Sequence, residues 1–290
     1  MPELPEIETT ISQLKNKVQK RTIIDVWTDV KNLIKKPKSY QEFRKEIKNQ
    51  KIQKIWRRAK NILFDLSNNK TLLIHQKLTG HLLFGKWKKE KKQWISIIKG
   101  PLANDPMNRF LHFIFFLDNG WQLALSDLRK FAKIELWNQK ELKKELEFLG
   151  FEPLNKDFNL ERFFQILSQK KSGSIKQILM DQKIITGIGN IYSDEILWQA
   201  KVHPLRKIST LNQREIKEIY KAIKEILLKA IKLKGESTSN YRTPTGEKGY
   251  FDKIKKVYRR QKERCSRCNT YIQRIKIKNQ FSHFCSGCQK

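Results

Sequence analysis

The sequence predicts an α+β protein with several domains: an N-terminal β-sandwich that begins with a helix, a helical region, and a small cysteine-rich finger. Three observations support this fold class. Runs of β-branched and aromatic residues dominate the chain to about residue 137, apolar residues recur at helical spacing from residue 138 onward, and all four cysteines lie in the last 26 residues. We therefore expect domains at residues 1–137, 138–252 and 253–290.

The composition limits the class of protein. Lys and Arg number 61 against 29 Asp and Glu, a net charge of +32, and the hydrophobic fraction of 39% is enough for a core. The nearest approach to a membrane span, Phe110–Leu117, is short, and the first residues lack the pattern of a signal peptide. We expect a cytoplasmic protein that binds a polyanion, with nucleic acid as the first candidate. A coding bias that inflates lysine is the alternative source of the charge.

The first element is an amphipathic helix. Its apolar positions follow helical spacing: Leu4, Ile7, Ile11, Leu14 and Val18. Pro5 suits the first turn, where its missing N–H is not needed. The expected strands are Thr22–Val30, Ile62–Leu66, Thr71–Gln76, Trp94–Ile98, Phe110–Leu117 and Trp121–Ser126. Turn residues at 68–69 and 118–120 indicate hairpins, so the domain is expected to be all-β after its helix.

Helices follow in the second region. They are expected at residues 141–149, 160–168, 174–180, 190–199 and 211–234. The polar stretch Gly235–Gly249 reads as a long loop, and such loops are often functional. The turn Thr186–Asn190 places two glycines and an N-cap residue before a helix, which is typical of an anion site. A tight interhelical turn without a ligand is the alternative.

The cysteines form one pattern, C-x2-C-x16-C-x2-C, made by Cys265, Cys268, Cys285 and Cys288. Two such knuckles complete a tetrahedral Zn²⁺ site, so we expect one structural zinc; two disulfides are the alternative, which a cytoplasmic chain disfavours. The residues between the knuckles predict a hairpin around Lys278 and Asn279. From Lys253 to Lys290 there are twelve Lys and Arg and one acid, which indicates phosphate contacts.

The N-terminus carries a possible nucleophile. Removal of Met1 before a proline exposes the secondary amine of Pro2, and a terminal amine is less basic than lysine. Attack on an aldehyde-level carbon would form an iminium. Glu3 is adjacent and Glu6 lies one helical turn on. The alternative is that these acids only offset the helix dipole.

Several segments together resemble one family. They are PELPEIET at residues 2–9, RAKNILF at 58–64, SDLRKF at 126–131, the stretch from Leu179 to Glu195, and the four-cysteine spacing. In the same order they are similar to motifs of the formamidopyrimidine-DNA glycosylases, bacterial enzymes that remove 8-oxoguanine and ring-opened purines. The resemblance covers essentially the whole chain. It implies a helix–two-turn–helix motif, a bifunctional glycosylase and AP lyase of base excision repair, and a monomer associated with the nucleoid.

The resemblance implies catalytic roles near the N-terminus. Pro2 would attack C1′ of the damaged nucleotide and form a Schiff base, after which β- and δ-elimination would cut the strand. Glu3 would be the general acid and base. Lys60 would act at the phosphate near the lesion, and Glu6 would help hold the extruded base. Flipping follows from geometry, because C1′ is inaccessible in a stacked duplex.

The resemblance also implies contacts with duplex DNA that contains oxidised purines or abasic sites. Arg129 would face the orphaned base and Phe131 would wedge the stack, although a phenylalanine at a strand end could equally be core. Leu78 stands where the family has a void-filling methionine, a swap of similar volume. The residue after Phe131 is Ala132, where the family usually has glycine.

Further contacts are implied in the second region and the finger. Lys176 and Asn190 would hold phosphates, and the Gly235–Gly249 loop, with Tyr241, would close over the flipped base. Gln280 occupies the position of the family's finger arginine, and it cannot make a charge-assisted bidentate contact. Lys278 or Arg274 are candidates to compensate.

Three other functions compete with this one. An endonuclease VIII-like enzyme, which prefers oxidised pyrimidines, typically has glycine where this chain has Leu4. A non-catalytic damaged-DNA-binding homologue would not need Pro2, Glu3 and Lys60 together. A zinc-ribbon protein of RNA or ribosome assembly would leave the N-terminal string unexplained.

Overall fold

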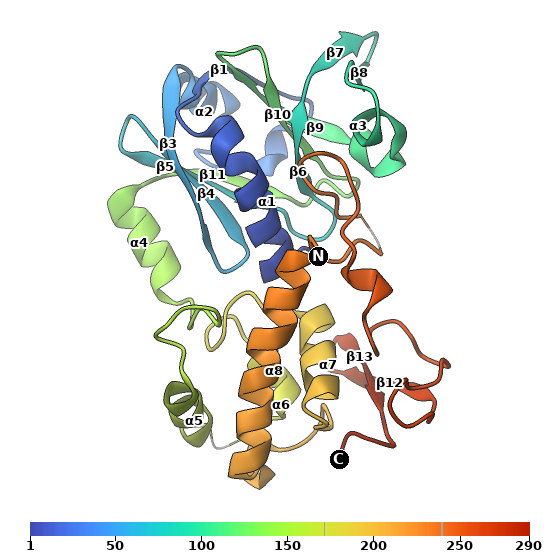
Figure 1. Ribbon diagram of the computed structural model, residues 1–290. Coiled ribbons are helices and arrows are strands. Elements are labelled where there is room, and N and C mark those ends of the chain that lie inside the picture. The colour runs from blue at the N-terminus through green and yellow to red at the C-terminus, as the bar shows by residue number, and fades with distance from the viewer. Residues whose placement is uncertain (171, 239) are drawn as a thin grey trace. The chain divides into compact units, whose positions relative to one another are not determined.

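The computed structural model describes residues 1–170, 172–238 and 240–290. It forms two compact units, Met1–Glu147 with Leu233–Asp252, and Phe148–Lys232 with Lys253–Lys290 (Figure 1). Residues 233–252, expected with the helical region, pack instead with the first unit. The physical reason is a set of long-range bonds, among them the Tyr241 hydroxyl that donates to the Glu6 carbonyl at 3.2 Å. The finger, expected as a separate domain, packs with the helical unit.

The first unit is built on nine strands in the order β2-β11-β5-β4-β3-β1-β9-β10-β6. Their bounds are β1 (Thr22–Thr28), β2 (Ile34–Lys36), β3 (Gln50–Arg58), β4 (Asn61–Leu66), β5 (Lys70–His75), β6 (His81–Gly85), β9 (Leu111–Leu117), β10 (Gln122–Ser126) and β11 (Lys133–Asn138). A separate hairpin joins β7 (Trp87–Glu90) to β8 (Gln93–Ser96).

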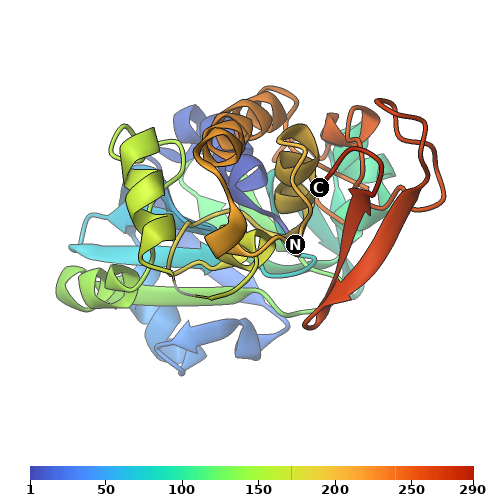
Figure 2. The same ribbon diagram turned by 90° about the horizontal axis from the view of Figure 1, so that it is seen from below.

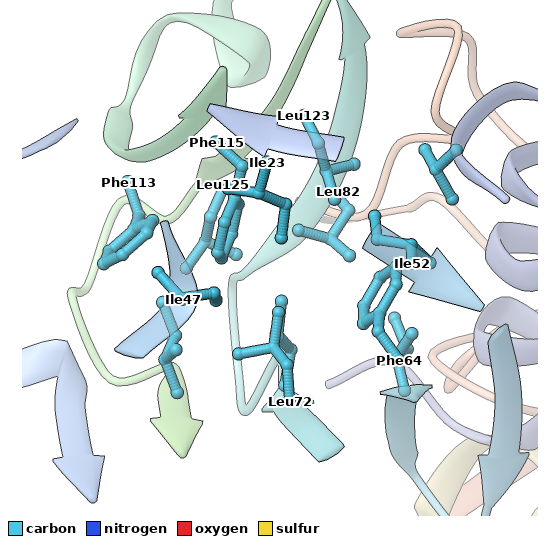
Figure 3. Close-up of a cluster of buried hydrophobic side chains, with 14 of the residues drawn as sticks. Ile23, Ile47, Ile52, Phe64, Leu72, Leu82, Phe113, Phe115, Leu123 and Leu125 are labelled. Carbon is cyan, nitrogen blue, oxygen red and sulfur yellow. The ribbon is translucent and has the colours of Figure 1, made fainter. Parts of the chain in front are cut away.

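The expected sandwich is confirmed by the way this sheet encloses its core. β1 pairs with β3 at only two positions but with β9 along most of its length, so the sheet divides there into two halves. One buried cluster draws Phe64 and Leu72 from one half and Phe115 and Leu123 from the other (Figure 3). The two halves therefore share a single hydrophobic core, which apolar burial stabilises.

Helices cover this core and link its strands. The expected N-terminal helix is α1 (Leu4–Val18), with Pro5 in its first turn and its apolar positions fully buried. The others are α2 (Tyr40–Ile47), α3 (Pro101–Asn104) and α4 (Gln139–Glu147), with 3₁₀ turns η1 (Lys31–Leu33), η2 (Pro106–Arg109) and η4 (Phe251–Lys253). α4 begins and ends two residues before its expected bounds.

Five strands and two helices of this unit were not among the expected elements: β2, β3, β6, β7, β11, α2 and α3. In β3, Ile52 and Ile55 are both buried although they are three residues apart, because a register shift between Ile52 and Lys54 breaks the alternation. The pattern therefore does not resemble a strand. In α2 the Ser39 hydroxyl accepts a hydrogen bond from the Glu42 N–H at 3.3 Å, so Ser39 is the N-cap of this helix.

The second unit holds the remaining helices and the finger. Its elements are α5 (Leu160–Ser168), α6 (Ile175–Met180), α7 (Asn190–Gln199), η3 (Ile208–Thr210), α8 (Gln213–Lys232), β12 (Ile272–Ile277) and β13 (Gln280–Cys285). The expected helices are confirmed, α5 and α7 at their expected bounds, and Figure 2 shows β12 and β13 as the expected hairpin. None of the helices in the described ranges combines the length and apolar character needed to cross a bilayer.

Candidate functional site

The N-terminal end of α1 is a buried cluster of charged groups. Glu3 and Glu6 are 2% and 1% exposed, and the Glu3 N–H donates to Glu6 Oε2 at 2.7 Å. This reciprocal cap fixes both carboxylates on the first helical turn. Burial lowers the pKa of the chain's terminal amine, and Glu3 and Glu6 oppose that shift. The amine, which immediately precedes Pro2, therefore lies within electrostatic reach of both acids.

Lys60 joins this cluster from the turn between β3 and β4. The turn is sharp, with Ala59 in the left-handed region at φ +55°. The Lys60 side chain is 5% exposed, and burial lowers its pKa while Glu3 and Glu6 oppose the shift. Lys60 is therefore a buried residue close to two acids, and the surface interpretation of this lysine does not hold. Pro2, Glu3, Glu6 and Lys60 are thus brought together as the motifs imply.

Glu236 is a member of the cluster that sequence reasoning missed. It is 3% exposed, its backbone N–H donates to Glu6 Oε1 at 2.8 Å, and its charge raises the pKa of the terminal amine. The Glu6 carboxylate therefore accepts two backbone N–H groups, one from Glu3 and one from Glu236. Glu6 thereby attaches the first residues of the Gly235–Gly249 loop to α1. The only signal in the sequence was that the Gly235–Gly249 loop contains two acids, Glu236 and Glu247.

Tyr241 packs against the same helix. It is 5% exposed, and burial raises its pKa, with the nearby Glu6 charge acting in the same direction. Its hydroxyl donates to the Glu6 carbonyl. The described residues of the Gly235–Gly249 loop carry no helix or strand, as expected, and Ser239 lies outside the described residues.

A second group of predicted residues lies on two adjoining loops. Phe131 and Leu78 are 50% and 40% exposed, so Phe131 is not part of the core. The loops meet where the Thr79 hydroxyl donates to the carboxylate of Asp127, a fully buried residue. Arg129 lies on the same loop as Phe131, with its guanidinium 4.6 Å from the centre of that ring. Two exposed apolar side chains and a cation are therefore presented together.

Ala132, which stands where the family usually has glycine, is accommodated without backbone strain. The left-handed conformation of this loop falls at Lys130, with φ +58°. Ala132 is 1% exposed, and its N–H donates to Asp127 Oδ2 at 2.8 Å. The loop therefore does not require glycine at position 132.

The glycine turn in the second unit ends one residue earlier than expected. Gly189 is the N-cap of α7, and Asn190 is the first helical residue. The Asn190 Nδ2 donates to the Phe281 carbonyl at 2.8 Å, while its buried Oδ1 has no partner among the described residues. Lys176 is 2% exposed, ion-paired with Asp194, and its Nζ lies 3.3 Å from the Asn190 carbonyl. Lys176 therefore stabilises the turn before α7 through its contact with the Asn190 carbonyl.

Asp194 links the turn to the finger. It accepts a hydrogen bond from the Ser282 hydroxyl at 2.6 Å and from the His283 N–H at 2.9 Å. Beside it the buried Glu195 accepts three backbone N–H groups, from Lys256, Val257 and Tyr258. Both acids lie on α7, so this helix positions the finger.

The four cysteines form a candidate metal centre. The sulfur atoms of Cys265, Cys268, Cys285 and Cys288 all lie within 4.8 Å of one another, and none is in a disulfide. The Trp198 indole N–H faces Cys265 Sγ at 3.4 Å, as donors do toward thiolates. Glycine is required at 287, because a Cβ there would lie 2.9 Å from Cys268 Sγ. Four converging sulfurs in a close-fitting knuckle suit Zn²⁺.

Gln280 lies at the tip of the finger hairpin. It opens β13 opposite Ile277 and is exposed. Arg274 packs its guanidinium 4.3 Å from the centre of the Phe281 ring, on the same hairpin. Lys278 occupies the turn itself, with φ +52°. Arg274 and Lys278 are therefore two cations on the same hairpin as the uncharged Gln280.

Comparison with protein families gives two matches. The model of the formamidopyrimidine-DNA glycosylase N-terminal domain matches residues 1–134, and that of the formamidopyrimidine-DNA glycosylase H2TH domain matches residues 149–242. Proteins named formamidopyrimidine-DNA glycosylase from Herpetosiphon aurantiacus and Ureaplasma parvum are 37% and 34% identical. In both cases the match covers 100% of this chain and 100% of the relative.

Solved structures are similar over the same length. A variant of Lactococcus lactis FPG in complex with Fapy-dG-containing DNA has a TM-score of 0.86 and 30% identity, covering 100% of both chains. The complex between Lactococcus lactis Fpg and DNA containing an abasic site has a TM-score of 0.86 and 30% identity, covering 99% of both chains.

Proposed function

Because the chain belongs to the formamidopyrimidine-DNA glycosylase family, we infer that it is a DNA glycosylase of base excision repair that acts on duplex DNA containing formamidopyrimidines, 8-oxoguanine or abasic sites. The observation that carries this inference is the cluster at the start of α1. A terminal amine, two buried carboxylates and a buried lysine lie together there. This is the set that amine-based attack on a sugar carbon requires.

We propose that Pro2, exposed by removal of Met1, is the nucleophile. Its nitrogen bonds to C1′ while the bond from C1′ to the base breaks, and the base leaves with a proton. The sugar ring then opens at its oxygen, and the secondary amine becomes an iminium that already carries a positive charge. This charge withdraws electrons from the sugar, so a proton leaves C2′ and the 3′-phosphate departs. Loss of a second proton, from C4′, then expels the 5′-phosphate. A terminal amine is less basic than a lysine side chain, so a larger fraction of it is neutral and able to attack near neutral pH.

Glu3 and Lys60 complete the chemistry. Glu3, fixed by the helix cap, donates a proton to the sugar ring oxygen and later accepts one. Lys60, which is buried close to Glu3 and Glu6, binds the phosphate beside the lesion, because an ammonium attracts the negative charge of a phosphate. Glu6 and Tyr241 hold the loop that covers the extruded base.

The exposed loops open the duplex. Phe131 inserts into the base stack, Leu78 fills the space that the damaged base leaves, and Arg129 faces the orphaned base. Asn190, at the N-terminal end of α7, binds phosphate, and Lys176 acts through it rather than directly, since its ammonium is paired with Asp194. One Zn²⁺ held by the four cysteines orders the finger, whose basic residues, with Gln280 at the tip, lie along the DNA backbone.

Borohydride trapping tests this function. Protein with a free N-terminus is mixed with an 8-oxoguanine:cytosine duplex and reduced, and we expect a covalent adduct that maps to Pro2. An N-terminally tagged protein is the control, because the tag blocks the amine. Absence of an adduct while the duplex still binds would contradict the catalytic proposal. Adduct formation only with a thymine glycol duplex would favour the endonuclease VIII-like alternative.

A further inference from the structure

The segment Pro101–Arg109, which includes α3 and η2, is bonded to the loop Gly235–Gly249. Asp105 Oδ2 accepts a hydrogen bond from Arg242 Nε at 2.6 Å, and Arg242 is only 5% exposed. The same guanidinium donates from Nη1 to the Tyr241 carbonyl at 2.8 Å. Arg242 therefore fixes the backbone of its neighbour while Asp105 fixes Arg242. The pair spans 137 positions of sequence.

Asn108 makes a second attachment. Its Nδ2 donates to the Gly246 carbonyl at 3.0 Å and to the Pro101 carbonyl at 2.9 Å, and it is 1% exposed. With both amide hydrogens used, Oδ1 accepts from His81 Nε2 at 3.1 Å. Gly246 has φ +84°, and a Cβ there would lie 2.7 Å from Asn108 Nδ2. The loop is shaped to receive this side chain.

The sheet fixes the same part of the loop. The Phe84 N–H on β6 donates to the Pro244 carbonyl at 2.8 Å. Residues 241–246 are thus held at Tyr241, Pro244 and Gly246 by groups outside the loop. Asp105 and Asn108 belong to neither the amine cluster nor the exposed Phe131 loop.

We propose that Asp105 and Asn108 are positioning residues for base recognition, because their hydrogen bonds to Arg242 and Gly246 hold residues 241–246 in one conformation. This rests on the proposed function, in which the loop covers the extruded base. A loop that is already ordered does not lose conformational freedom on binding, so a larger fraction of the enzyme is competent to bind. An abasic site has no base to cover, so its cleavage does not depend on this ordering.

The test compares two substrates in Asp105→Asn and Asn108→Ala. We expect kcat/KM on an 8-oxoguanine:cytosine duplex to fall about tenfold, while kcat/KM on a preformed abasic site stays within about twofold. Asp25→Asn is the matched control, since Asp25 also pairs with an arginine, Arg44, at 2.6 Å but on β1. Equal losses on both substrates, or no loss on either, would overturn the proposal.

A second readout needs no activity. Without DNA, trypsin should cut after Lys248 several times faster in Asp105→Asn than in the unaltered protein or in Asp25→Asn. Unchanged cleavage together with normal activity would overturn the positioning role alone. Failure of the unaltered protein to cleave either duplex would overturn the proposed function, and the positioning role with it.

Discussion

The Asp127 carboxylate holds Phe131 by its backbone: Oδ2 accepts the Phe131 N–H at 2.8 Å and leaves the ring half exposed. The buried acid thus orders the loop, while the ring is available to contact another molecule. A substitution of Phe131 should therefore affect activity alone, whereas a substitution of Asp127 should affect both stability and activity.

Phe131→Ala should impair excision without unfolding the protein. The ring is half exposed, so we expect the free energy of unfolding to change by about 0.5 kcal/mol or less. Excision of 8-oxoguanine should slow at least about tenfold, because a stacked base pair must then open without a wedge. Single-turnover kinetics and urea unfolding give the two quantities. Leu128→Ala, at a side chain that is 44% exposed on the same loop, is the control and should excise normally.

Asp127→Asn should destabilise the protein as well as slow excision. The carboxylate accepts the N–H groups of Phe131 and Ala132 in a fully buried position, and an amide cannot accept all of its present donors. We expect a loss of about 2 kcal/mol in the free energy of unfolding. Asp118→Asn, at an exposed acid that accepts the Thr22 N–H, should cost less than about 1 kcal/mol. Equal losses in the two variants would contradict this account of the loop.

Zinc removal should change the fluorescence of Trp198. It is the tryptophan of the second unit, and its indole N–H faces Cys265 Sγ. A strong chelator should change the protein's fluorescence and abolish duplex binding, because the finger loses its ordering centre. The Trp198→Phe variant should lose binding equally but show little fluorescence change. A fluorescence response that persists in Trp198→Phe would place the effect outside the finger.

Protein stability should fall as pH falls from about 6.5 to 4. Burial lowers the pKa of His81 to about 4 and that of His75 to about 3. The unfolded chain binds these protons near pH 6.5, so within this range it holds more protons than the folded protein, and acid favours unfolding. His81 alone accounts for about 3 kcal/mol between pH 7 and 4.

His81→Gln tests this pH dependence, since glutamine can still donate to Asn108. Urea unfolding at several pH values should show a flatter dependence in this variant. His112→Gln, at a histidine paired with the partly exposed Asp29, is the control. If the free energy of unfolding of His81→Gln depends on pH as steeply as that of the unaltered protein, groups other than His81 cause the pH dependence.

Gln280→Arg should strengthen DNA binding. The new cation would lie at the hairpin tip near Lys278 and make the charge-assisted phosphate contact that glutamine cannot make. We expect duplex affinity to rise several-fold and the slope of log K against log salt to steepen by about 1. Gln273→Arg places the same charge on β12 opposite Phe284. If both variants gain equally, the effect is net charge rather than a local contact.

Local sequence patterns predicted the N-terminal helix, the four-cysteine cluster and the family of this protein. The 3.6-residue spacing from Leu4 to Val18 predicted α1 because one face of a helix must be buried, and the cysteine spacing predicted a cluster of four sulfurs because two knuckles converge on one ion. The motif strings identified the family and singled out Lys60. Patterns failed where regularity is broken, as at the bulge in β3.

Tertiary structure alone decided how the loop 233–252 is held. The sequence marked it as a loop but assigned it to the helical region, whereas Arg242 pairs with Asp105 and Gly246 receives Asn108, both far away along the chain. It also decided that Glu6 accepts two backbone N–H groups and that Lys176 is paired with Asp194. Periodicity reports which face of one segment is buried. Partners more than a hundred positions apart depend on strand register and packing, which appear only when the whole chain is folded.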